Sequence, residues 1–556
     1  MRKIRKQYII ALIFTLIGVL VCQNLYALRV PMTGYKTVEK TFKDIKESEL
    51  QPPEQSHLTS NSEVVHSLFD GYSIQFGRKQ ENIVPKFYDL SQPTGDAYTW
   101  AQMHISLKRA IGSDYVFNPI IHVIRKNEFE LLVRGTAQRG KALVRFLQDI
   151  YGGSWNVVKE GIVPEIIVEK ALETQGYKEL VGKLPPSAIA ITYGPDLYYH
   201  NGYVIEDNIG YLGGRRSIFE LHKALRSIFP GSALVDSEVL EQHYAKGLKD
   251  ILPIGDGGIA YWEDPAFKKF HDFSNESKIL KESGILFVGG RMEGENRFEI
   301  DEHEGLFVIT PDKQRVKIGY LNYCEYDFTL DPDYSPFIKR TEDLGYDKIC
   351  NGIPGIISLV KKDKLLLGHS IGSSLADSKL IYPFVEKLIR FYLKEEPIFK
   401  STRVFALNEK YGLKRLTSEE IMQRRDDLVL KPIMGERGVG VVIGRFVDNN
   451  EWEEALERAF DKPDDFLLFE YVEPLHIGDY ITSHRPIIEI MPDLETNVYP
   501  GVYARTKHVL GDGVIGFGRA GTESMIVLVE GISISDIGQP NTISKEVSYI
   551  KPATDL

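Results

Sequence analysis

The stretch GYVIEDN at residues 202–208 ends an apolar run with three consecutive polar side chains. Residues 203–205 are of types that favour a pleated, half-buried strand. Because side chains alternate along a strand, Glu206 and Asn208 point to one face and Asp207 to the other. A carboxylate and an amide on one face offer hard oxygen ligands, which suit magnesium. The alternative is an edge strand whose polar end is only solvated.

The residues before this strand predict a hairpin that brings a third oxygen ligand to it. An Asn-Gly pair at 201–202 lies between two apolar runs, which is a strong hairpin signal. A two-residue turn would pair Asp196 with Asp207, facing away from Glu206. A three-residue loop that includes the preceding histidine, with the glycine left-handed, pairs Asp196 with Glu206, and we expect this register. The oxygens of Asp196, Glu206 and Asn208 would then converge as a metal site.

A second group of residues is suited to binding phosphate. Lys431 closes the apolar strand LVLK, and the glycine-rich segment GERGVG follows three residues later. An ammonium neutralises phosphate charge, while the amides of Gly435, Gly438 and Gly440 can approach the oxygens closely. The loop is no Walker loop, because no Gly-Lys-Ser/Thr closes it. The alternative is an ordinary glycine-rich hairpin turn.

Three further positions extend this group. The segment FLLFEYVEP places Glu470 at the end of an apolar strand, where a carboxylate is more often simply solvated. In a nucleotide site, backbone groups of Tyr471 and Val472 would face an adenine edge while Glu470 takes the exocyclic amine or the ribose. Arg485 and Arg505 lie in apolar strand-like segments, where a guanidinium usually has an anionic partner. That partner is either an internal carboxylate or a phosphate.

Composition limits the class of protein. A chain of 556 residues exceeds one compact core, so two or three subdomains are expected. The formal net charge of −11 argues against a nucleic-acid partner, whose phosphates need a basic face. The three cysteines have no metal-ligand spacing, so neither a disulfide framework nor a zinc site is predicted.

The N-terminus differs in kind from the rest. Residues 1–27 carry four basic residues, an apolar run over 8–22 and a small-residue cleavage point after Ala27, which predicts a signal peptide or a short signal anchor. The run is short for a membrane span of roughly 20 residues. By the positive-inside rule the chain would be exported or membrane-anchored through residues 8–22. A site that faces the cytoplasm is the alternative.

Alternating helices and strands predict an α/β (α+β) architecture. Residues 28–97 read as a polar linker or arm, and residues 531–556 as a loosely structured tail. Apolar spacing predicts helices over 137–151, 217–229 and 380–399, and short strands over 280–330, with further strands after residue 466.

The lysine strand, glycine loop, FEYV hinge and Glu-x-Asn pair together resemble an ATP-grasp ligase. In that class the Glu-x-Asn pair normally comes last, whereas here it precedes Lys431 by more than two hundred residues. This order resembles the circularly permuted ATP-grasp family. The blocks TAQRGKALVRFLQDIYGG, GPDLYYHNGYVIEDN, CNGIPGIISLVKKDKLLLGHSIGSSLADSK, LVLKPIMGERGVGVVIG and PGVYARTK are similar to the family's, in the family's order.

The resemblance covers roughly residues 100–530 and implies two parts, an N-terminal one over 98–330 with the metal-binding hairpin and a nucleotide-binding one over 331–530. It implies ATP and Mg2+ as cofactors. The activity implied is ligation through an acyl phosphate, in which a small-molecule or peptide carboxylate joins an amine with release of ADP and phosphate. The implied roles are metal binding by Asp196, Glu206 and Asn208, phosphate binding by Lys431, Arg505 and Lys379, and a lid over 435–440; a solvated helix-start lysine is the alternative for Lys379.

The chain departs from the family at its presumed substrate residues. Tyr323 and Cys324 stand at about the place of two consecutive arginines, and GFGRAGTES lacks the family's lysine. Either the substrate is altered, or the protein is a catalytically inactive module that binds a nucleotide or another ligand.

Overall fold

The computed structural model describes residues 117–530 with gaps, together with the short strands β1 (Ile74–Phe76), β2 (Lys79–Glu81) and β3 (Lys86–Asp89). The gaps are 210–211, 216, 220, 223–236, 253–256, 264–281, 290–295, 324–329, 344–351, 436–437, 478 and 517–520. The leader, the attachment segment 8–22 and the tail 531–556 lie outside the described residues. Within the described ranges no helix is both long and apolar enough to cross a membrane.

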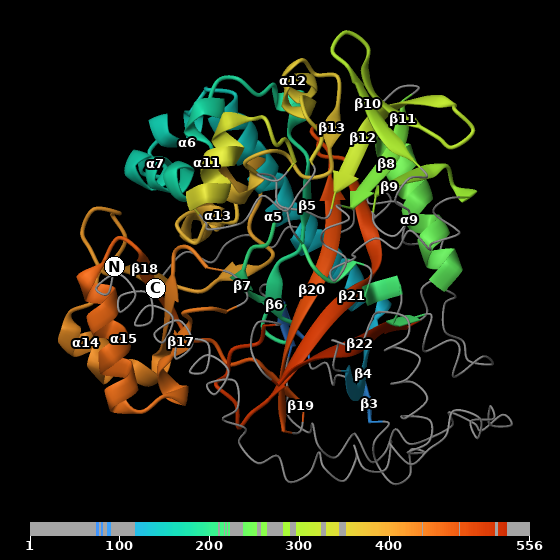
Figure 1. Cartoon of the computed structure of the whole chain (residues 1–556). Coiled ribbons are helices and arrows are strands. Elements are labelled where there is room, and N and C mark those ends of the chain that lie inside the picture. The colour runs from blue at the N-terminus through green and yellow to red at the C-terminus, as the bar shows by residue number, and fades with distance from the viewer. Residues whose placement is uncertain are drawn as a thin grey trace, which may run out of the picture. The chain divides into compact units, whose positions relative to one another are not determined.

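Ten of the described strands form one mixed sheet (Figure 1). Its order is β14-β7-β6-β20-β21-β22-β4-β3, with β5 and β19 paired to β20. The long strands β20 and β21 are buried over nearly their whole length, although both carry polar and charged residues. This sheet takes strands from both sides of residue 330. The bounds are β4 Phe117–Arg125, β5 Ile191–Tyr193, β6 Asp196–Tyr198, β7 Tyr203–Glu206, β14 Lys400–Ser401, β19 Leu475–Ile477, β20 Tyr480–Ile490, β21 Thr496–His508 and β22 Thr522–Glu530.

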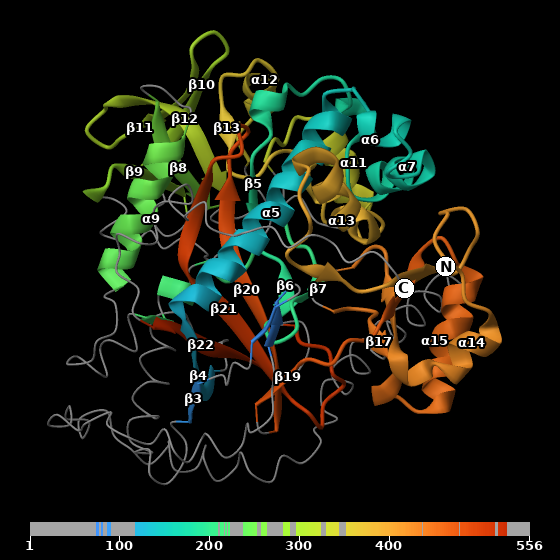
Figure 2. The same ribbon diagram turned by 180° about the vertical axis from the view of Figure 1, so that it is seen from behind.

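Helix α5 (Lys126–Tyr151) packs against β20 and runs along the sheet in Figure 2. The helix predicted over 137–151 is confirmed, and it begins earlier. Gly140 allows the close approach, since a Cβ there would lie 2.4 Å from Ile490 Cδ1. The helix ends before the glycine pair at 152–153, as expected from the flexibility of glycine.

A second sheet has the order β10-β11-β12-β8-β9, with β13 on β12. It confirms the short strands predicted over 280–330, and α9 (Ser237–Ile251) packs against β21 of the large sheet. The bounds are β8 Gly258–Glu263, β9 Ile285–Gly289, β10 Arg297–Asp301, β11 Gly305–Ile309, β12 Arg315–Tyr323 and β13 Leu366–Leu367.

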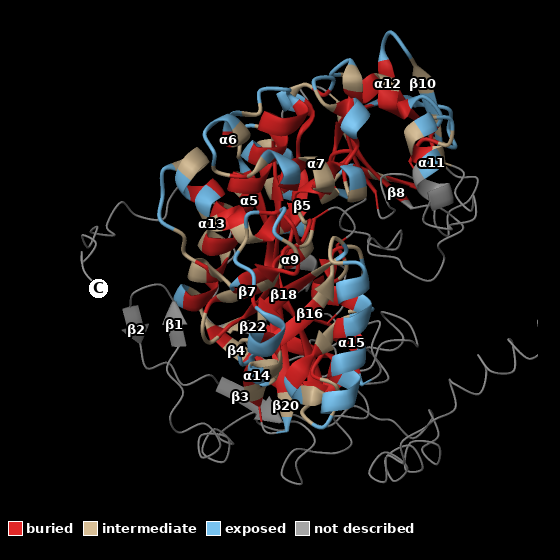
Figure 3. Cartoon of the chain, turned by 90° about the vertical axis from the view of Figure 1, so that its left-hand side faces the viewer, coloured by how far each residue is buried: buried red, intermediate tan, exposed pale blue. Residues whose placement is uncertain are grey.

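A third sheet has the order β15-β18-β16-β17 and its own core with α14 (Ser418–Gln423) and α15 (Asn449–Asp461). Strand alternation sends Leu428, Leu430 and Leu468 into that core, where Trp452 of α15 is fully buried. Figure 3 shows the exposed side of α15 beside the buried strands β16 and β18. The bounds are β15 Val404–Ala406, β16 Leu428–Pro432, β17 Val442–Ile443 and β18 Phe466–Glu470.

The single helix predicted over 380–399 is wrong in form. The chain makes a 3-10 turn at Tyr382–Phe384, a short α13 (Val385–Leu388) and a π-helical turn at Ile389–Leu393, and then enters β14. Pro383 lies in the first turn of this stretch, where a missing N–H removes no helical hydrogen bond. Most of the predicted helix 217–229 lies outside the described residues. Smaller helices are α6 Asn156–Lys159, α7 Glu165–Thr174, α11 Ser335–Asp343 and α12 Ile356–Lys361.

Candidate functional site

The hairpin β6–β7 has the predicted register at its functional end, where Asp196 is opposite Glu206. The turn is one residue longer than expected, because Tyr198 pairs with Tyr203. A β-bulge between these two pairs restores the register. Gly202 is left-handed with φ +69°, as predicted, and its N–H donates to Tyr198 O at 3.0 Å.

Asp196 is buried in an ion-pair cluster with two arginines. Arg485 donates to it through Nε at 2.7 Å and Nη2 at 2.9 Å, and Arg505 Nη2 lies 2.5 Å from Oδ1. Burial opposes the charged carboxylate, but the two guanidiniums outweigh it and hold the pKa of Asp196 well below its usual range. Of the two predicted partners for these arginines, the internal carboxylate is present. Arg505 Nε is buried and has no hydrogen-bond partner among the described residues.

Glu206 and Asn208 offer less occupied groups than Asp196. The Glu206 side chain is 38% exposed, and its Oε1 lies 3.3 Å from Lys379 Nζ. Asn208 Nδ2 is buried without a hydrogen-bond partner in the described part of the chain. A buried unpaired N–H donor is costly, so Asn208 Nδ2 suits a ligand that offers an acceptor oxygen, such as a phosphate. No three His, Cys, Asp or Glu side chains in the described ranges are grouped to hold a metal.

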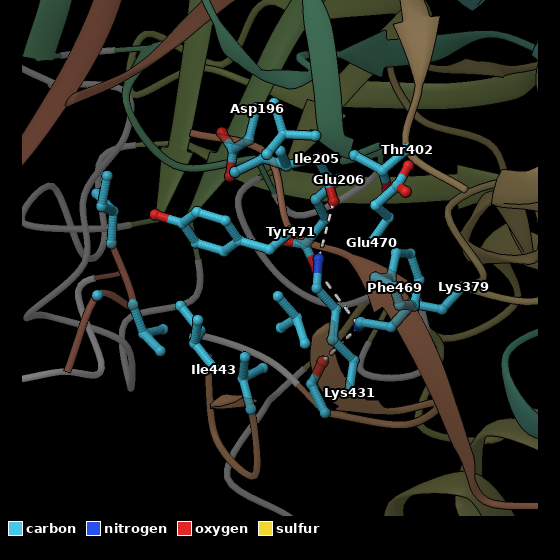
Figure 4. Close-up of a pocket in the computed structure, with 18 of the residues that line it drawn as sticks. Asp196, Ile205, Glu206, Lys379, Thr402, Lys431, Ile443, Phe469, Glu470 and Tyr471 are labelled. Carbon is cyan, nitrogen blue, oxygen red and sulfur yellow. Dashed lines mark hydrogen bonds and ion pairs between the residues drawn. The ribbon is translucent and has the colours of Figure 1, made fainter. Parts of the chain in front are cut away.

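Two lysines from different parts of the chain contact the hairpin β6–β7, namely Lys431 of β16 and Lys379 (Figure 4). Strand alternation puts Lys431 on the face of β16 away from the α15 core, where its Nζ lies 4.4 Å from the Phe469 ring centre. Lys431 Nζ donates to Ile205 O at 3.0 Å. Burial lowers the pKa of Lys431 to about 8, against the opposing effect of nearby Glu206. Lys379 Nζ also donates to Gly435 O at 3.2 Å, which ties the glycine loop to the hairpin.

Asp196, Glu206, Lys379 and Lys431 line a cavity with about 830 Å³ of empty space, counting the open solvent at its mouth. Asn208, Arg485 and Arg505 are not among its lining residues. Gly435 and Gly438 line it, whereas Gly440 does not. The polar lining is Asp196, Glu206, Lys379, Thr402, Lys431 and Glu470, and the apolar lining includes Val429, Val441, Ile443, Phe469, Tyr471, Val472, Val514 and Ile515.

The hinge segment, residues 470–472, makes more contacts with other parts of the protein than the sequence suggested. The Glu470 carboxylate binds Arg403 at 2.6 Å and lies 3.6 Å from Arg424. The Tyr471 N–H donates to Asp427 O at 2.8 Å, so this donor is removed from an adenine site. The Tyr471 ring lies 4.0 Å from the Arg445 guanidinium carbon. Glu470, Tyr471 and Val472 nevertheless all line the cavity.

Sequence reasoning missed one wall of the cavity. Residues 513–515, in the loop after β21, line it beside the glycine loop. Gly513 is left-handed with φ +73°, and a Cβ there would lie 2.6 Å from a Phe446 ring carbon. The Gly-Asp-Gly sequence at 511–513 was the available signal, but it indicates a turn and not its position.

The sequence of the chain, which has this mixed α/β fold and this cavity, also matches a known protein family. Residues 121–255 and 344–468 match the model of a family described as a circularly permuted ATPgrasp. The resemblance seen in the motifs is therefore confirmed, since these two ranges match the circularly permuted ATP-grasp family.

Curated relatives span much of the chain. An uncharacterized protein of Synechocystis sp. is 28% identical over 439 residues, covering 72% of this chain and 82% of that protein. An uncharacterized protein of Mycobacterium leprae is 24% identical over 430 residues, covering 72% and 69%. A Frankia casuarinae protein provisionally named glutamate–cysteine ligase 2-2 is 24% identical over 399 residues, covering 70% of this chain and 43% of that protein.

Among solved structures, a glutathione synthetase-like effector from Globodera pallida in its apo form covers 73% of this chain and 89% of that chain. The sequence identity is 11% and the TM-score 0.41, a likeness too low to support an argument.

Proposed function

We propose that the protein is a Mg-ATP-dependent ligase that joins a carboxylate to an amine through an acyl phosphate. The observation that carries this proposal is the meeting of two lysines, a glycine loop and Glu206 at one cavity. The family match and the ligase name of the Frankia casuarinae relative support ATP-dependent ligation at a coarse level. The carboxylate and the amine are small molecules or peptides.

The donor set fits a magnesium ion. Glu206 and Asn208 would hold it, because Mg2+ takes one or two protein oxygens and completes its shell with water and substrate phosphates. The bound Mg2+ would neutralise charge on the phosphates. Asp196 was also predicted as a ligand, but its oxygens are already bound by Arg485 and Arg505. The contacts of Asp196 favour a role in holding these two arginines. A metal ion would have to share the same carboxylate oxygens of Asp196.

The chain's own cations would handle the phosphoryl group. Lys431 and Lys379 would bind the phosphates, and the amides of residues 435–440 would cover them as a lid. Two guanidiniums face the single carboxylate of Asp196, which leaves one positive charge in excess in this buried cluster. Arg505 would use this excess positive charge to stabilise the transferred phosphoryl group. Glu470, Tyr471 and Val472 would border the adenine.

The proposed reaction has two steps. A carboxylate oxygen of the substrate attacks the γ-phosphorus, and the bond to the β-phosphate oxygen breaks, releasing ADP. The amine nitrogen then attacks the acyl carbon, the carbon–oxygen bond to phosphate breaks, and the amine loses a proton. Catalysis in such phosphoryl transfer consists mostly of positioning and charge neutralisation, which matches the residues gathered here.

One observation favours an alternative, a nucleotide-binding module without ligase activity. Tyr323 stands where the family has an arginine, and it is fully buried with its hydroxyl donating to His369 O at 3.0 Å. A buried tyrosine cannot supply the positive charge of an arginine at that place.

Two measurements on the full chain separate these functions. Calorimetry of Mg-ATP binding tests the cavity, with Glu206→Gln as the variant that should bind weakly. ADP release is then measured with mixed carboxylates and hydroxylamine, which captures an acyl phosphate as a hydroxamate. Hydroxamate formation that needs ATP and a carboxylate is expected of the ligase. Tight Mg-ATP binding without ADP release across a broad set of carboxylates would favour the binding module.

A further inference from the structure

Asp207 lies between Glu206 and Asn208 but faces away from the cavity, as strand alternation requires. It is buried, and Arg139 of α5 binds it with two parallel bonds, Nε to Oδ1 at 2.6 Å and Nη2 to Oδ2 at 2.8 Å. The Tyr193 hydroxyl of β5 donates to Oδ1 at 2.6 Å. The side chains of Arg139 and Asp207 are each 1% exposed, so solvent does not weaken this pair.

Arg139 also connects the pair to the neighbouring strand. Its Nη1 donates to Ser401 Oγ at 3.0 Å, and Ser401 lies in β14 opposite Val204 of β7. The Tyr382 ring lies 5.4 Å from the Arg139 guanidinium carbon, and the Tyr382 hydroxyl donates to Val204 O. Asp207 is thus joined to α5, β5 and β14 at a single point.

The backbone of residues 207–208 lies just beyond the regular strand pairing. Strand β7 ends at Glu206, so the regular ladder does not extend to Asp207 and Asn208. Beyond it, Gly194 N–H donates to Asn208 O at 3.0 Å, Tyr193 forms a bridge with Ile209, and Ile209 N–H donates to Asp377 Oδ2 at 3.3 Å. The direction of the Glu206 and Asn208 side chains therefore depends strongly on how Asp207 is fixed between them.

We infer that Arg139, Asp207 and Tyr193 are positioning residues that hold Glu206 and Asn208 in place for a divalent cation. This inference rests on the proposed function of the cavity. The three residues do not line the cavity, so they would act through the backbone of residues 206–208. Groups that orient metal ligands from behind typically change metal affinity by about 10–100-fold when they are replaced.

The test measures how much magnesium tightens ATP binding. The dissociation constant of ATP is determined by calorimetry in excess EDTA and in excess Mg2+, and their ratio is the magnesium enhancement. Tyr193→Phe removes one bond to Asp207 and should lower the enhancement about tenfold. Arg139→Lys keeps the charge but loses the two-bond fork, and should lower it further.

A matched control deletes another buried hydroxyl. Tyr499→Phe removes the bond from the Tyr499 hydroxyl to the Tyr244 hydroxyl at 2.9 Å, in the separate core beneath α9. It should reduce thermal stability about as much as Tyr193→Phe while the magnesium enhancement stays at the wild-type value. Melting curves of all variants establish that each is folded.

The outcomes separate the two claims. If wild-type ATP binding shows no magnesium enhancement, the proposed metal site is wrong. If the wild-type chain shows the enhancement and folded Tyr193→Phe and Arg139→Lys both retain it, the proposed function stands and the positioning role is overturned. A wild-type magnesium enhancement in folded Arg139→Lys alone would likewise overturn the role given to the two-bond contact between Arg139 and Asp207.

Discussion

The lowered pKa of Lys431 predicts that nucleotide binding weakens at alkaline pH. In the free protein, burial lowers this pKa to about 8, against about 10.4 for an ordinary lysine. A bound phosphate would favour the ammonium and raise the pKa again. Binding therefore requires a protonated Lys431, and the protonated fraction of the free protein falls as the pH rises through 8.

The size of the effect follows from this titration. If the bound lysine stays protonated, the apparent affinity for ATP falls about tenfold per pH unit above 8, which amounts to roughly 30-fold between pH 7 and pH 9.5. At pH 8 about half a proton should be taken up per ATP bound. Calorimetry at constant Mg2+, in two buffers of different ionisation enthalpy, measures both quantities.

Lys431→Arg is the matched control, because a guanidinium keeps its charge across this range. Its affinity for ATP should be nearly constant from pH 7 to pH 9.5, with no proton uptake at pH 8. The reasoning is refuted if the wild-type affinity is also flat, or if the arginine variant shows the same decline as the wild type.

Two further substitutions test the charges around the cavity. Asp196→Asn leaves Arg485 and Arg505 buried without their counter-charge and should lower the free energy of unfolding by about 3–5 kcal/mol at neutral pH, as measured by denaturant titration. Because the pKa of Asp196 is lowered in the folded protein, the stabilisation that its carboxylate gives is present above the ordinary aspartate pKa and is lost as the pH falls below it. The difference in stability between wild type and Asp196→Asn should therefore shrink in acid. A variant as stable as wild type at pH 7 would contradict this account. Lys379→Met removes a cation that is proposed to bind phosphate and should weaken Mg-ATP binding about 10–100-fold by calorimetry. Unchanged affinity would place Lys379 outside the phosphate site.

The sequence predicted the elements of the site well, because strand alternation and turn chemistry are local. The pairing of Asp196 with Glu206, the left-handed Gly202 and the strands on either side of the glycine loop were all readable from neighbouring residues. The β-bulge was not readable, since a longer turn and a bulge give the same pairing as a shorter turn without one.

Contacts between distant segments could not be predicted from the sequence. Arg139 and Asp207 are 68 positions apart, and Asp196 and Arg485 are 289 apart. The sequence indicated that Arg485 and Arg505 needed an anion but left open which one. It also assigned Asp196 to a metal, because a carboxylate beside Glu206 looks the same whether arginines or a cation complete its bonding.

The most direct test of the central claim is whether Mg-ATP stabilises the folded chain through this cavity. At about a hundred times its dissociation constant, the ligand should raise the free energy of unfolding by about 2.7 kcal/mol. Glu206→Gln and Lys431→Ala should each lose most of that gain while melting normally without ligand. A wild-type chain that gains nothing from Mg-ATP, or variants that gain as much as wild type, would contradict the assignment of this cavity as a nucleotide site.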